Sequence, residues 1–113
     1  MQELVTNMKA DFFKALAHPS RIRILERIAE QEVCVCELVD ELGLEQSNLS
    51  QHLAVLRKQH IVTCTKVGLK TNYRIKHPEV LEILQKVQAV LTSQLMESEA
   101  LMRHMAEAAS NSK

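Results

Sequence analysis

The sequence predicts a mainly α-helical fold with a small β-wing, in the arrangement called a winged helix-turn-helix. Within residues 33–62, two short helical patterns meet at Gly43 with almost no chain between them, which is typical of a helix-turn-helix. The period of the apolar residues then changes over about residues 61–76, where β-branched residues flank Gly68 as in a β-hairpin. A last segment, about residues 78–108, repeats apolar residues at helical spacing and predicts one long helix.

Two helices are expected before the helix-turn-helix. Residues 3–17 place apolar side chains at helical spacing, and His18 together with Pro19 ends that pattern. Pro19 suits the first turn of the second helix, which we expect to reach about Ala29. Residues 33–36 are expected to add a short strand.

The helix-turn-helix itself is expected to join a helix over residues 37–42 to a recognition helix over about residues 46–59. Gly43 is the expected left-handed cap between them, because glycine adopts a positive φ without steric cost. The recognition helix turns one apolar face toward the core, formed by Leu49, Leu53 and Leu56.

Length and composition fit one globular domain over residues 1–113. The sequence has no apolar run of membrane-spanning length and no signal-peptide pattern, so we expect a cytoplasmic protein without a membrane partner. In that compartment the three cysteines are expected to be reduced thiols and not disulfide-bonded. The small and polar residues 109–113 are expected to fray.

Positive charge is concentrated in the middle of the chain, although the formal net charge is zero. Residues 43–77 hold six Lys or Arg residues against one acidic residue, whereas residues 1–42 and residues 78–113 each hold more acidic than basic residues. This basic segment coincides with the predicted helix-turn-helix and wing, which indicates double-stranded DNA as the partner.

The polar face of the predicted recognition helix holds candidate base-reading side chains. The amides of Gln and Asn can pair bidentately with adenine, and Ser can serve several bases, although the same residues also suit a solvated helix face. The candidates are Gln46, Ser47, Asn48, Ser50 and Gln51. His52 lies beside apolar positions and is either packed or in contact with a phosphate. Phosphate contacts are expected from Arg57, Lys58, Lys66, Lys70 and Arg74, with Lys70 at the tip of the wing.

A Cys-X-Cys pair, Cys34 and Cys36, opens the first helix of the helix-turn-helix. A helix N-terminus lowers the pKa of a thiol and so favours binding of soft metal ions, whereas the alternative is that both side chains are small buried apolar groups. Two thiolates are too few for a closed tetrahedral site. Cys64, on the first strand of the wing, is the remaining candidate for a third ligand, provided that its strand lies close enough to residues 33–35.

The terminal helices carry more apolar residues than so small a domain is expected to cover, unless each simply packs on its own domain. Pairing across a two-fold axis would bury the excess, so we expect helices from both termini to form the interface of a homodimer. Two recognition helices could then address two half-sites about 34–36 Å apart.

Taken together, these segments resemble the ArsR/SmtB family of winged-helix transcriptional repressors. The matching segments are F-K-A-L-A-H-P-S-R-I-R-I-L (13–25), V-C-V-C-E-L (33–38), Q-S-N-L-S-Q-H-L-A-V-L-R (46–57) and N-Y-R-I (72–75). The resemblance covers about residues 10–80 and implies a dimer that binds an operator and releases it when metal ions or metalloids bind. Other members of the family respond to thiol oxidation or to sulfur species, and some have no known inducer site.

The sequence departs from the family pattern at two positions. Glu45 stands where the family often has the serine that caps the recognition helix, and Val39 stands where the family's arsenic-binding motif, which resembles C-V-C-x-x-C, has a third cysteine. The family also holds metal on its long helix, but the spacing of its ligands there is not matched by His77, Glu79, Glu82 and His104. We therefore expect no metal site on the long helix.

The expected function is that of a DNA-binding repressor, released from its operator by a thiophilic effector at Cys34 and Cys36. The resemblance implies As(III) or Sb(III), or a soft divalent ion among Cd(II), Pb(II) and Zn(II), as the effector and no obligatory cofactor. The alternatives are a repressor that senses redox state or reactive sulfur through the same thiols, and a family member without an inducer site. An enzyme is not expected, because the sequence has no phosphate-binding loop and no Ser/His/Asp pattern.

Overall fold

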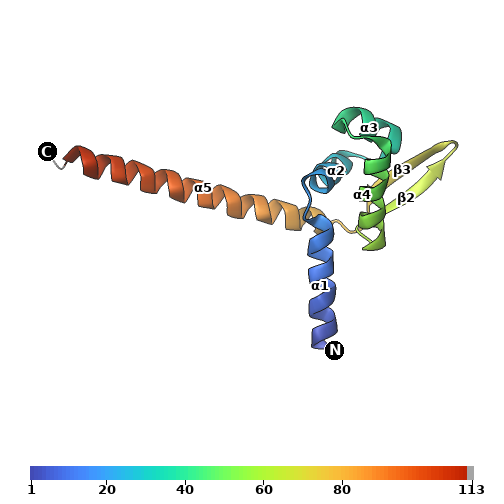
Figure 1. Cartoon of the computed structure of the whole chain (residues 1–113), viewed down its shortest axis with the longest axis horizontal. Helices are drawn as coiled ribbons and strands as arrows, with labels where there is room; N and C mark the ends of the chain where they lie inside the picture. Colours follow the sequence, from blue (N-terminus) through green and yellow to red (C-terminus); the bar gives the residue numbers. More distant parts are fainter. Residues whose placement is uncertain (112–113) are drawn as a thin grey trace. The chain divides into compact units, whose positions relative to one another are not determined.

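The computed structural model describes residues 1–111 and confirms the predicted fold class in that range (Figure 1). The elements are α1 (Gln2–Leu16), α2 (Pro19–Glu30), β1 (Val33–Cys34), α3 (Val35–Leu42), α4 (Gln46–Lys58), β2 (Val62–Val67), β3 (Lys70–Ile75) and α5 (Glu79–Asn111). The internal contacts divide the chain into two compact units, Met1–Leu81 and Glu82–Lys113. The expectation of a single domain over residues 1–113 therefore stays a prediction.

The core of the first unit lies where α2, α3 and α4 pack against one another and against the sheet. The apolar face of α4 is buried as predicted, because Leu49, Leu53 and Leu56 recur at spacings of four and three residues. These side chains meet other fully buried ones from the neighbouring elements, namely Ile24, Leu25, Leu38 and Ile61. Burial of this face leaves the opposite face of α4 exposed to solvent.

The helix ends follow the predicted local chemistry. The His18 ring Nδ1 accepts a hydrogen bond from the Ser20 backbone N–H at 3.0 Å, and Pro19 stands in the first turn of α2. Gly43 ends α3 in the left-handed region with φ 65°. Glu45 precedes α4 and makes no side-chain capping hydrogen bond, in agreement with the missing hydroxyl cap.

A tight reversal at His60 leads α4 into the wing. His60 has a φ of 58°, and its N–H donates to the Arg57 carbonyl at 3.0 Å. The next N–H, from Ile61, donates to the Leu56 carbonyl at 3.0 Å. This pair of bonds satisfies carbonyls at the end of the helix, so the chain turns at once into β2.

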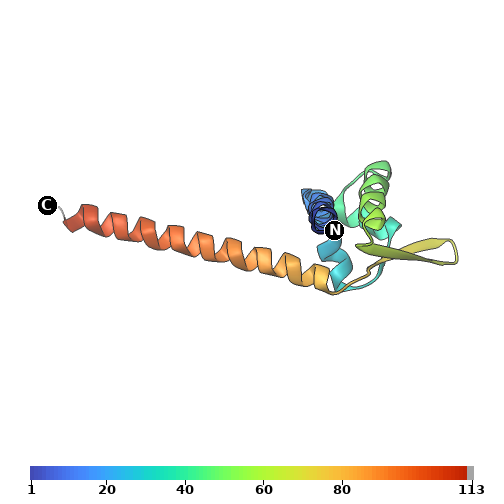
Figure 2. The ribbon, with the colours of Figure 1, turned by 90° about the horizontal axis from the view of Figure 1, so that it is seen from below.

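The three strands form one antiparallel sheet in the order β1-β3-β2. β2 and β3 are joined by the two-residue loop Gly68-Leu69, in which Gly68 has a φ of 64°. A glycine with positive φ at the first central position suits a two-residue hairpin, because that turn matches the right-handed twist of the strands. Figure 2 shows this hairpin, the predicted wing, extending beyond the helices of its unit.

Three predicted element boundaries are wrong. β1 ends at Cys34 and not at residue 36, and α3 begins at Val35 and not at residue 37, so Cys36 lies inside the helix. α5 continues to Asn111, so residues 109–111 are helical and do not fray, while residues 112–113 of that prediction lie outside the described part of the chain. The alanine-rich composition of residues 106–109 explains the continuation, because Ala has the highest helix propensity.

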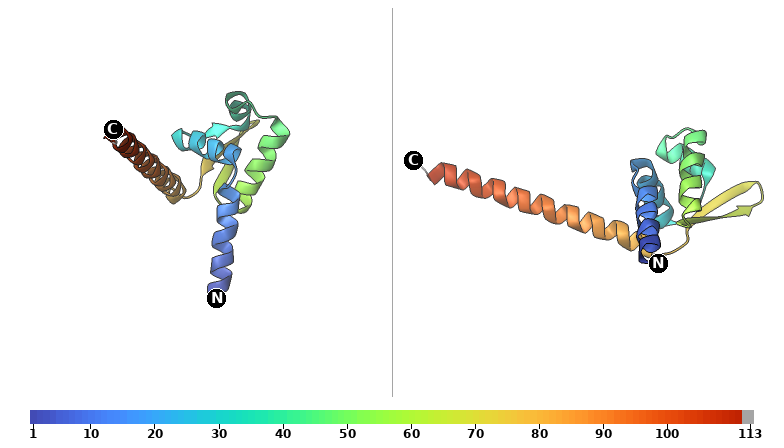
Figure 3. Two further views of the ribbon diagram at one scale, coloured as in Figure 1. Left: turned by 60° about the vertical axis from the view of Figure 1, so that its left-hand side comes forward. Right: turned by 60° about the horizontal axis from the view of Figure 1, so that its bottom comes forward.

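Both terminal helices expose apolar side chains in the single chain. On α1 these include Leu4, Met8 and Phe13, while only Ala15 and Leu16 at its end are buried. α5 is one continuous helix (Figure 3). Its exposed apolar residues include Val87, Leu91, Leu95, Met102 and Met105. Over residues 1–111, none of the helices is both long enough and apolar enough to cross a bilayer.

Candidate nucleic-acid interface and cysteine site

The exposed face of α4 carries all five polar side chains proposed to read bases. Gln46, Ser47, Asn48, Ser50 and Gln51 are exposed to solvent, while Leu49 between them is buried. They occupy the first half of the helix, which is the part that reaches base edges in a helix-turn-helix. The geometry therefore permits base contacts by these residues, and their individual roles stay predictions.

The basic residues proposed to contact phosphates lie on the last turn of α4 and on both strands of the wing. Arg57 and Lys58 end α4, Lys66 lies on β2, and Lys70 and Arg74 lie on β3. All five side chains are exposed, and none takes part in a salt bridge within residues 1–111. Their charges are available to neutralise DNA phosphates and release counterions.

His52 is engaged in a side-chain cluster that sequence reasoning did not find. Arg21 Nε donates a hydrogen bond to His52 Nδ1 at 3.2 Å, and the His52 and His18 ring centroids lie 4.4 Å apart. Arg21 also donates to the backbone carbonyls of Lys14 and Ala15. The cluster joins the recognition helix to the junction of α1 and α2, so of the two expected roles of His52, packing and a phosphate contact, these contacts favour packing.

The environment of His52 lowers its pKa below the ordinary value of 6.5. Burial of the ring is the largest cause, because it disfavours the imidazolium, and the positive charges of His18 and Arg21 act in the same direction. The neutral form fits the observed contact, since only a deprotonated Nδ1 can accept the hydrogen bond from Arg21.

Cys34 and Cys36 are joined by a disulfide, which corrects the expectation of three reduced thiols. Cys34 is the last residue of β1 and the N-cap of α3, while Cys36 lies in the first turn of the helix. The chain bends at this junction and brings the two Cα atoms to 5.4 Å, within the range that a disulfide requires. Cys34 is buried, with 4% of its surface exposed, whereas Cys36 is exposed.

Cys64 is not brought to this pair. It lies on β2, and β3 separates β2 from β1, so about 9–10 Å lies between the two backbones. Cys64 is paired with Tyr73 and Cys34 with Asn72, so the two cysteines occupy alternate register positions on opposite faces of the sheet. Within residues 1–111, no group of three or more His, Cys, Asp or Glu side chains is placed to hold a metal ion.

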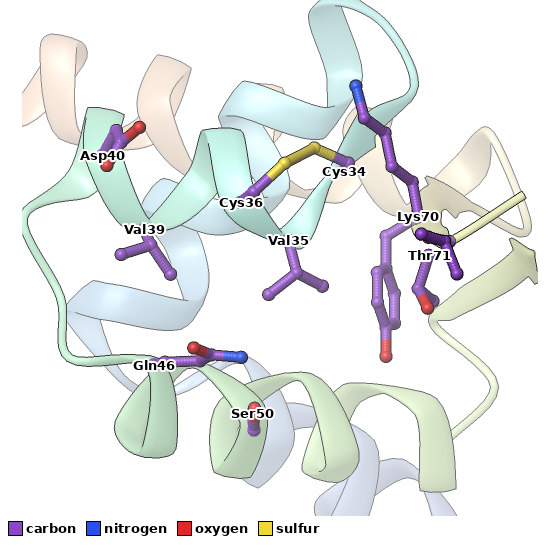
Figure 4. A pocket seen from close by; sticks show the side chains of 11 residues that line it. Cys34, Val35, Cys36, Val39, Asp40, Gln46, Ser50, Lys70 and Thr71 are labelled. Atoms are coloured by element: carbon purple, nitrogen blue, oxygen red, sulfur yellow. A yellow bond between two sulfur atoms is a disulfide. The ribbon is translucent and has the colours of Figure 1, made fainter. Parts of the chain in front are cut away.

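The cysteine pair borders a hollow of about 570 Å³ between α3, α4 and the wing (Figure 4). We call it the disulfide hollow. Cys34, Val35, Cys36, Val39 and Asp40 line it from β1 and α3, Gln46 and Ser50 from α4, and Leu69, Lys70, Thr71 and Tyr73 from the wing. The hollow thus joins the cysteine pair to two residues of the proposed base-reading face and to the proposed phosphate contact at the wing tip. The sequence alone does not predict that the cysteine pair lies beside the wing, because this proximity depends on the pairing of β1 with β3.

The free energy of unfolding should decrease as the pH falls below about 6.5, and His52 should contribute to the decrease. The folded state holds His52 neutral, while the unfolded chain titrates near 6.5, so in the window from 6.5 down to the folded pKa the unfolded state binds more protons. The stabilisation is fully present above this window and is lost as the pH falls through it. In His52→Asn, an amide oxygen can still accept from Arg21 but does not titrate.

Urea denaturation at about pH 7.5 and about pH 5.5 checks this expectation through the stability difference within each protein. His52→Asn should lose less stability between the two pH values than the unsubstituted protein. The two proteins differ at residue 52 alone, so the difference between their losses reports on His52. Equal losses would show that His52 is not held neutral by the fold.

Comparison with known proteins agrees with this arrangement. Residues 18–63, from the N-cap of α2 into β2, match the family described as "Bacterial regulatory protein, arsR family". The chain is 41% identical over 104 residues to Rv0081 of Mycobacterium tuberculosis, described as an uncharacterized HTH-type transcriptional regulator, with 91% of each chain covered. The crystal structure of Rv0081 matches with a TM-score of 0.78 at 43% identity, over 83% of this chain and 95% of that chain.

Two further proteins extend the similarity. The arsenical resistance operon repressor of Staphylococcus xylosus is 34% identical over 80 residues, which cover 71% of this chain and 77% of the relative. The solution structure of a homodimeric winged helix-turn-helix DNA-binding domain from Mycobacterium bovis matches with a TM-score of 0.78 at 26% identity, over 85% of this chain and 89% of that chain. The chain therefore belongs to the ArsR family and is a DNA-binding transcriptional repressor of the winged helix-turn-helix type, not an enzyme.

Proposed function

We propose that this repressor binds its operator as a homodimer and that the thiol–disulfide state of Cys34 and Cys36 sets its affinity for the operator. The observation that carries the proposal is the disulfide hollow, where the cysteine pair meets residues of the recognition helix and of the wing. A chemical change at the pair is therefore adjacent to groups proposed to touch DNA.

In the proposed complex with DNA, α4 contacts the bases and the wing contacts the phosphates. The exposed amide and hydroxyl side chains of α4 can read base edges, and the unpaired basic side chains of the wing can hold phosphates. Phosphate contacts contribute to affinity for DNA of any sequence, whereas base contacts discriminate between sequences.

Replacement of Lys70 and of Gln51 should separate these two kinds of contact. Lys70→Ala should weaken binding to operator and to random duplex alike and reduce the slope of log affinity against log salt by about one. Gln51→Ala should cost roughly 1–3 kcal/mol on the operator only, because the loss falls on a base contact. Fluorescence anisotropy titrations of both duplexes at several salt concentrations measure both effects, and each variant serves as the control for the other. If both variants bind as the unsubstituted protein does, the DNA-binding surface is elsewhere.

The homodimer is proposed from the apolar stripe of α5 and from the homodimeric relative of known structure. Leu91 and Leu95 are both exposed in the single chain and lie on one face of the helix, one turn apart. A second copy that covers this face removes apolar surface from water and presents two recognition helices to two half-sites.

Charge placed on this face should break the dimer. Leu91→Glu/Leu95→Glu should sediment as one chain at micromolar concentration and lose operator affinity, because only one half-site can then be held. The matched control is Ser93→Glu, since residue 93 lies about 200° around the helix from residue 91. A double variant that sediments as two chains would contradict the assignment of this face to the interface.

The switch is proposed as a two-step oxidation by a hydroperoxide. The thiolate of one cysteine attacks the peroxide oxygen, so an alcohol or water leaves and a sulfenic acid forms; the second thiol then attacks that sulfur and releases water. Two electrons pass from the two sulfurs to the peroxide, and the product is the Cys34–Cys36 disulfide. A persulfide reaches the same product by transferring its outer sulfur to one cysteine, after which the second thiol displaces hydrosulfide.

The two sulfurs of Cys34 and Cys36 suit disulfide formation better than they suit binding of a soft metal ion. A closed site for Cd(II), Pb(II) or Zn(II) needs more ligands than two thiolates, and Cys64 is two strands away. As(III) is the second candidate effector, because two sulfurs that can form a disulfide can also meet at one arsenic, with solvent or a small thiol completing the site. The name of the Staphylococcus xylosus relative, an arsenical resistance operon repressor, also favours As(III) over the divalent ions.

Oxidation of the pair should loosen operator binding about 5–150-fold, which corresponds to a typical coupling free energy of about 1–3 kcal/mol between two sites. The dithiol and disulfide forms, each verified by mass spectrometry, are compared in an anisotropy titration. Cys34→Ser/Cys36→Ser should bind the operator with one and the same affinity before and after peroxide, while Cys64→Ser should keep the response. Arsenite added to the reduced protein tests the second candidate in the same assay. If neither peroxide nor arsenite changes the affinity, the effector proposal fails and the DNA-binding assignment stands.

A further inference from the structure

We propose that operator DNA and small thiol-reactive molecules compete directly for the disulfide hollow, with Cys36 as the sulfur that reacts first and that DNA covers. This inference rests on the proposed function, because it takes the cysteine pair as the effector site and α4 with the wing as the DNA-binding surface. It adds a second route of release, in which a group bonded to Cys36 blocks DNA directly, beside the release by the internal disulfide.

The two sulfurs have different access to solvent. Cys34 has 4% of its surface exposed and closes the end of β1, so a reagent in solution does not reach it first. Cys36 is exposed on the first turn of α3 and borders the hollow. A position in the first turn of a helix also favours the thiolate, which is the reactive form. Cys36 is therefore the sulfur that attacks the reagent, and Cys34 is the thiol that then attacks the Cys36 sulfur and closes the disulfide.

The walls of the hollow come from the elements that hold DNA. Gln46 and Ser50 belong to the exposed face of α4, and Lys70 begins β3 at the tip of the wing, so the hollow lies between recognition helix and wing (Figure 4). A duplex that takes a helix into its major groove and a hairpin into the adjacent minor groove has one sugar–phosphate strand between the two grooves. With α4 in one groove and the wing in the other, we expect that strand to cross the hollow.

The lining of the hollow holds one acidic and one basic side chain, Asp40 on α3 and Lys70 at the tip of the wing. Lys70 is the basic side chain in its lining and is exposed, so it can meet a DNA phosphate or the carboxylate of a small anionic thiol. The volume of about 570 Å³ admits a tripeptide-sized group bonded to Cys36. Such a group would occupy the space that the DNA strand needs, whereas the internal disulfide leaves the hollow open to solvent.

Protection of single cysteines by DNA tests the competition. Cys34→Ser/Cys64→Ser leaves Cys36 as the only thiol, and Cys36→Ser/Cys64→Ser leaves Cys34. N-ethylmaleimide should alkylate the Cys36-only protein at least ten times more slowly with saturating operator than without it. The Cys34-only protein should react slowly in both conditions. The same operator concentration at a salt concentration that prevents binding is the control, and there the Cys36 rate should recover.

A size series tests direct occlusion. Exchange with glutathione disulfide transfers one glutathionyl group to the Cys36 thiolate and releases glutathione thiolate. Methyl methanethiosulfonate transfers only a methylthio group to the same thiolate and releases methanesulfinate. Operator affinity of the Cys36-only protein should fall at least tenfold with the glutathionyl group and clearly less with the methylthio group. Equal alkylation rates with and without operator, or a glutathionyl protein that binds as tightly as the unmodified one, would overturn the competition.

Two further readouts keep the test decisive. If the serine variants do not fold, the sulfur that is labelled first in the reduced, unsubstituted protein is identified by mass mapping with and without operator, and first labelling at Cys34 would overturn the inference. If peroxide does not change operator affinity but DNA still protects Cys36, the proposed switch fails and the competition stands. If peroxide changes affinity but DNA gives no protection, the switch stands and the competition fails.

Discussion

The pairing of β1 with β3 is the constraint on which the candidate effector site depends. Only two residues of β1 take part, with Val33 opposite Tyr73 and Cys34 opposite Asn72. Because Cys34 is both the last residue of β1 and the N-cap of α3, the register of the sheet fixes where α3 begins. A shift of α3 relative to the wing at this point has to break backbone hydrogen bonds of the ladder, worth about 0.5–1.5 kcal/mol each.

The other end of α3 is held by charge. Arg27 on α2 forms a short bidentate ion pair with Glu41, and its Nη2 lies 3.9 Å from a carboxylate oxygen of Glu37. The hydrogen bond from Arg27 is the main cause that lowers the pKa of Glu41, so this carboxylate stays ionised as the pH falls toward its ordinary titration range. The sheet thus contacts one end of α3 and this ion pair contacts the other. Occlusion of DNA by a group bonded to Cys36 does not require α3 to move.

Local structure can be predicted well from this sequence, whereas contacts between segments far apart in the chain cannot. The apolar spacing of Leu49, Leu53 and Leu56, the left-handed cap at Gly43 and the glycine-containing hairpin all depend on residues close in the chain, and each was predicted correctly. The start of α3 was misplaced by two residues, because the C-X-C segment has no proline, glycine or hydroxyl cap to mark a helix start.

The candidate site shows the same contrast. The exposed polar face of α4 was predictable, since it is the complement of the apolar one. The distance between Cys64 and Cys34 could not be predicted. It depends on the strand order β1-β3-β2, which differs from the order of the strands along the chain. The contact of Arg21 with His52 joins residues 31 positions apart and left no local pattern that could have revealed it.

The small size of the first unit gives a reason why the proposed effector site and the proposed DNA contacts share a surface. A unit of about 80 residues has one core, and here α2, α3, α4 and the sheet all contribute their apolar faces to it. A reactive cysteine pair has to be reached from solvent, so its two sulfurs cannot both lie within that core. In this unit it lies at a strand-to-helix junction, where a buried and an exposed sulfur can be neighbours. Because the same junction is paired to the wing, a reagent that reaches Cys36 enters the hollow beside Lys70.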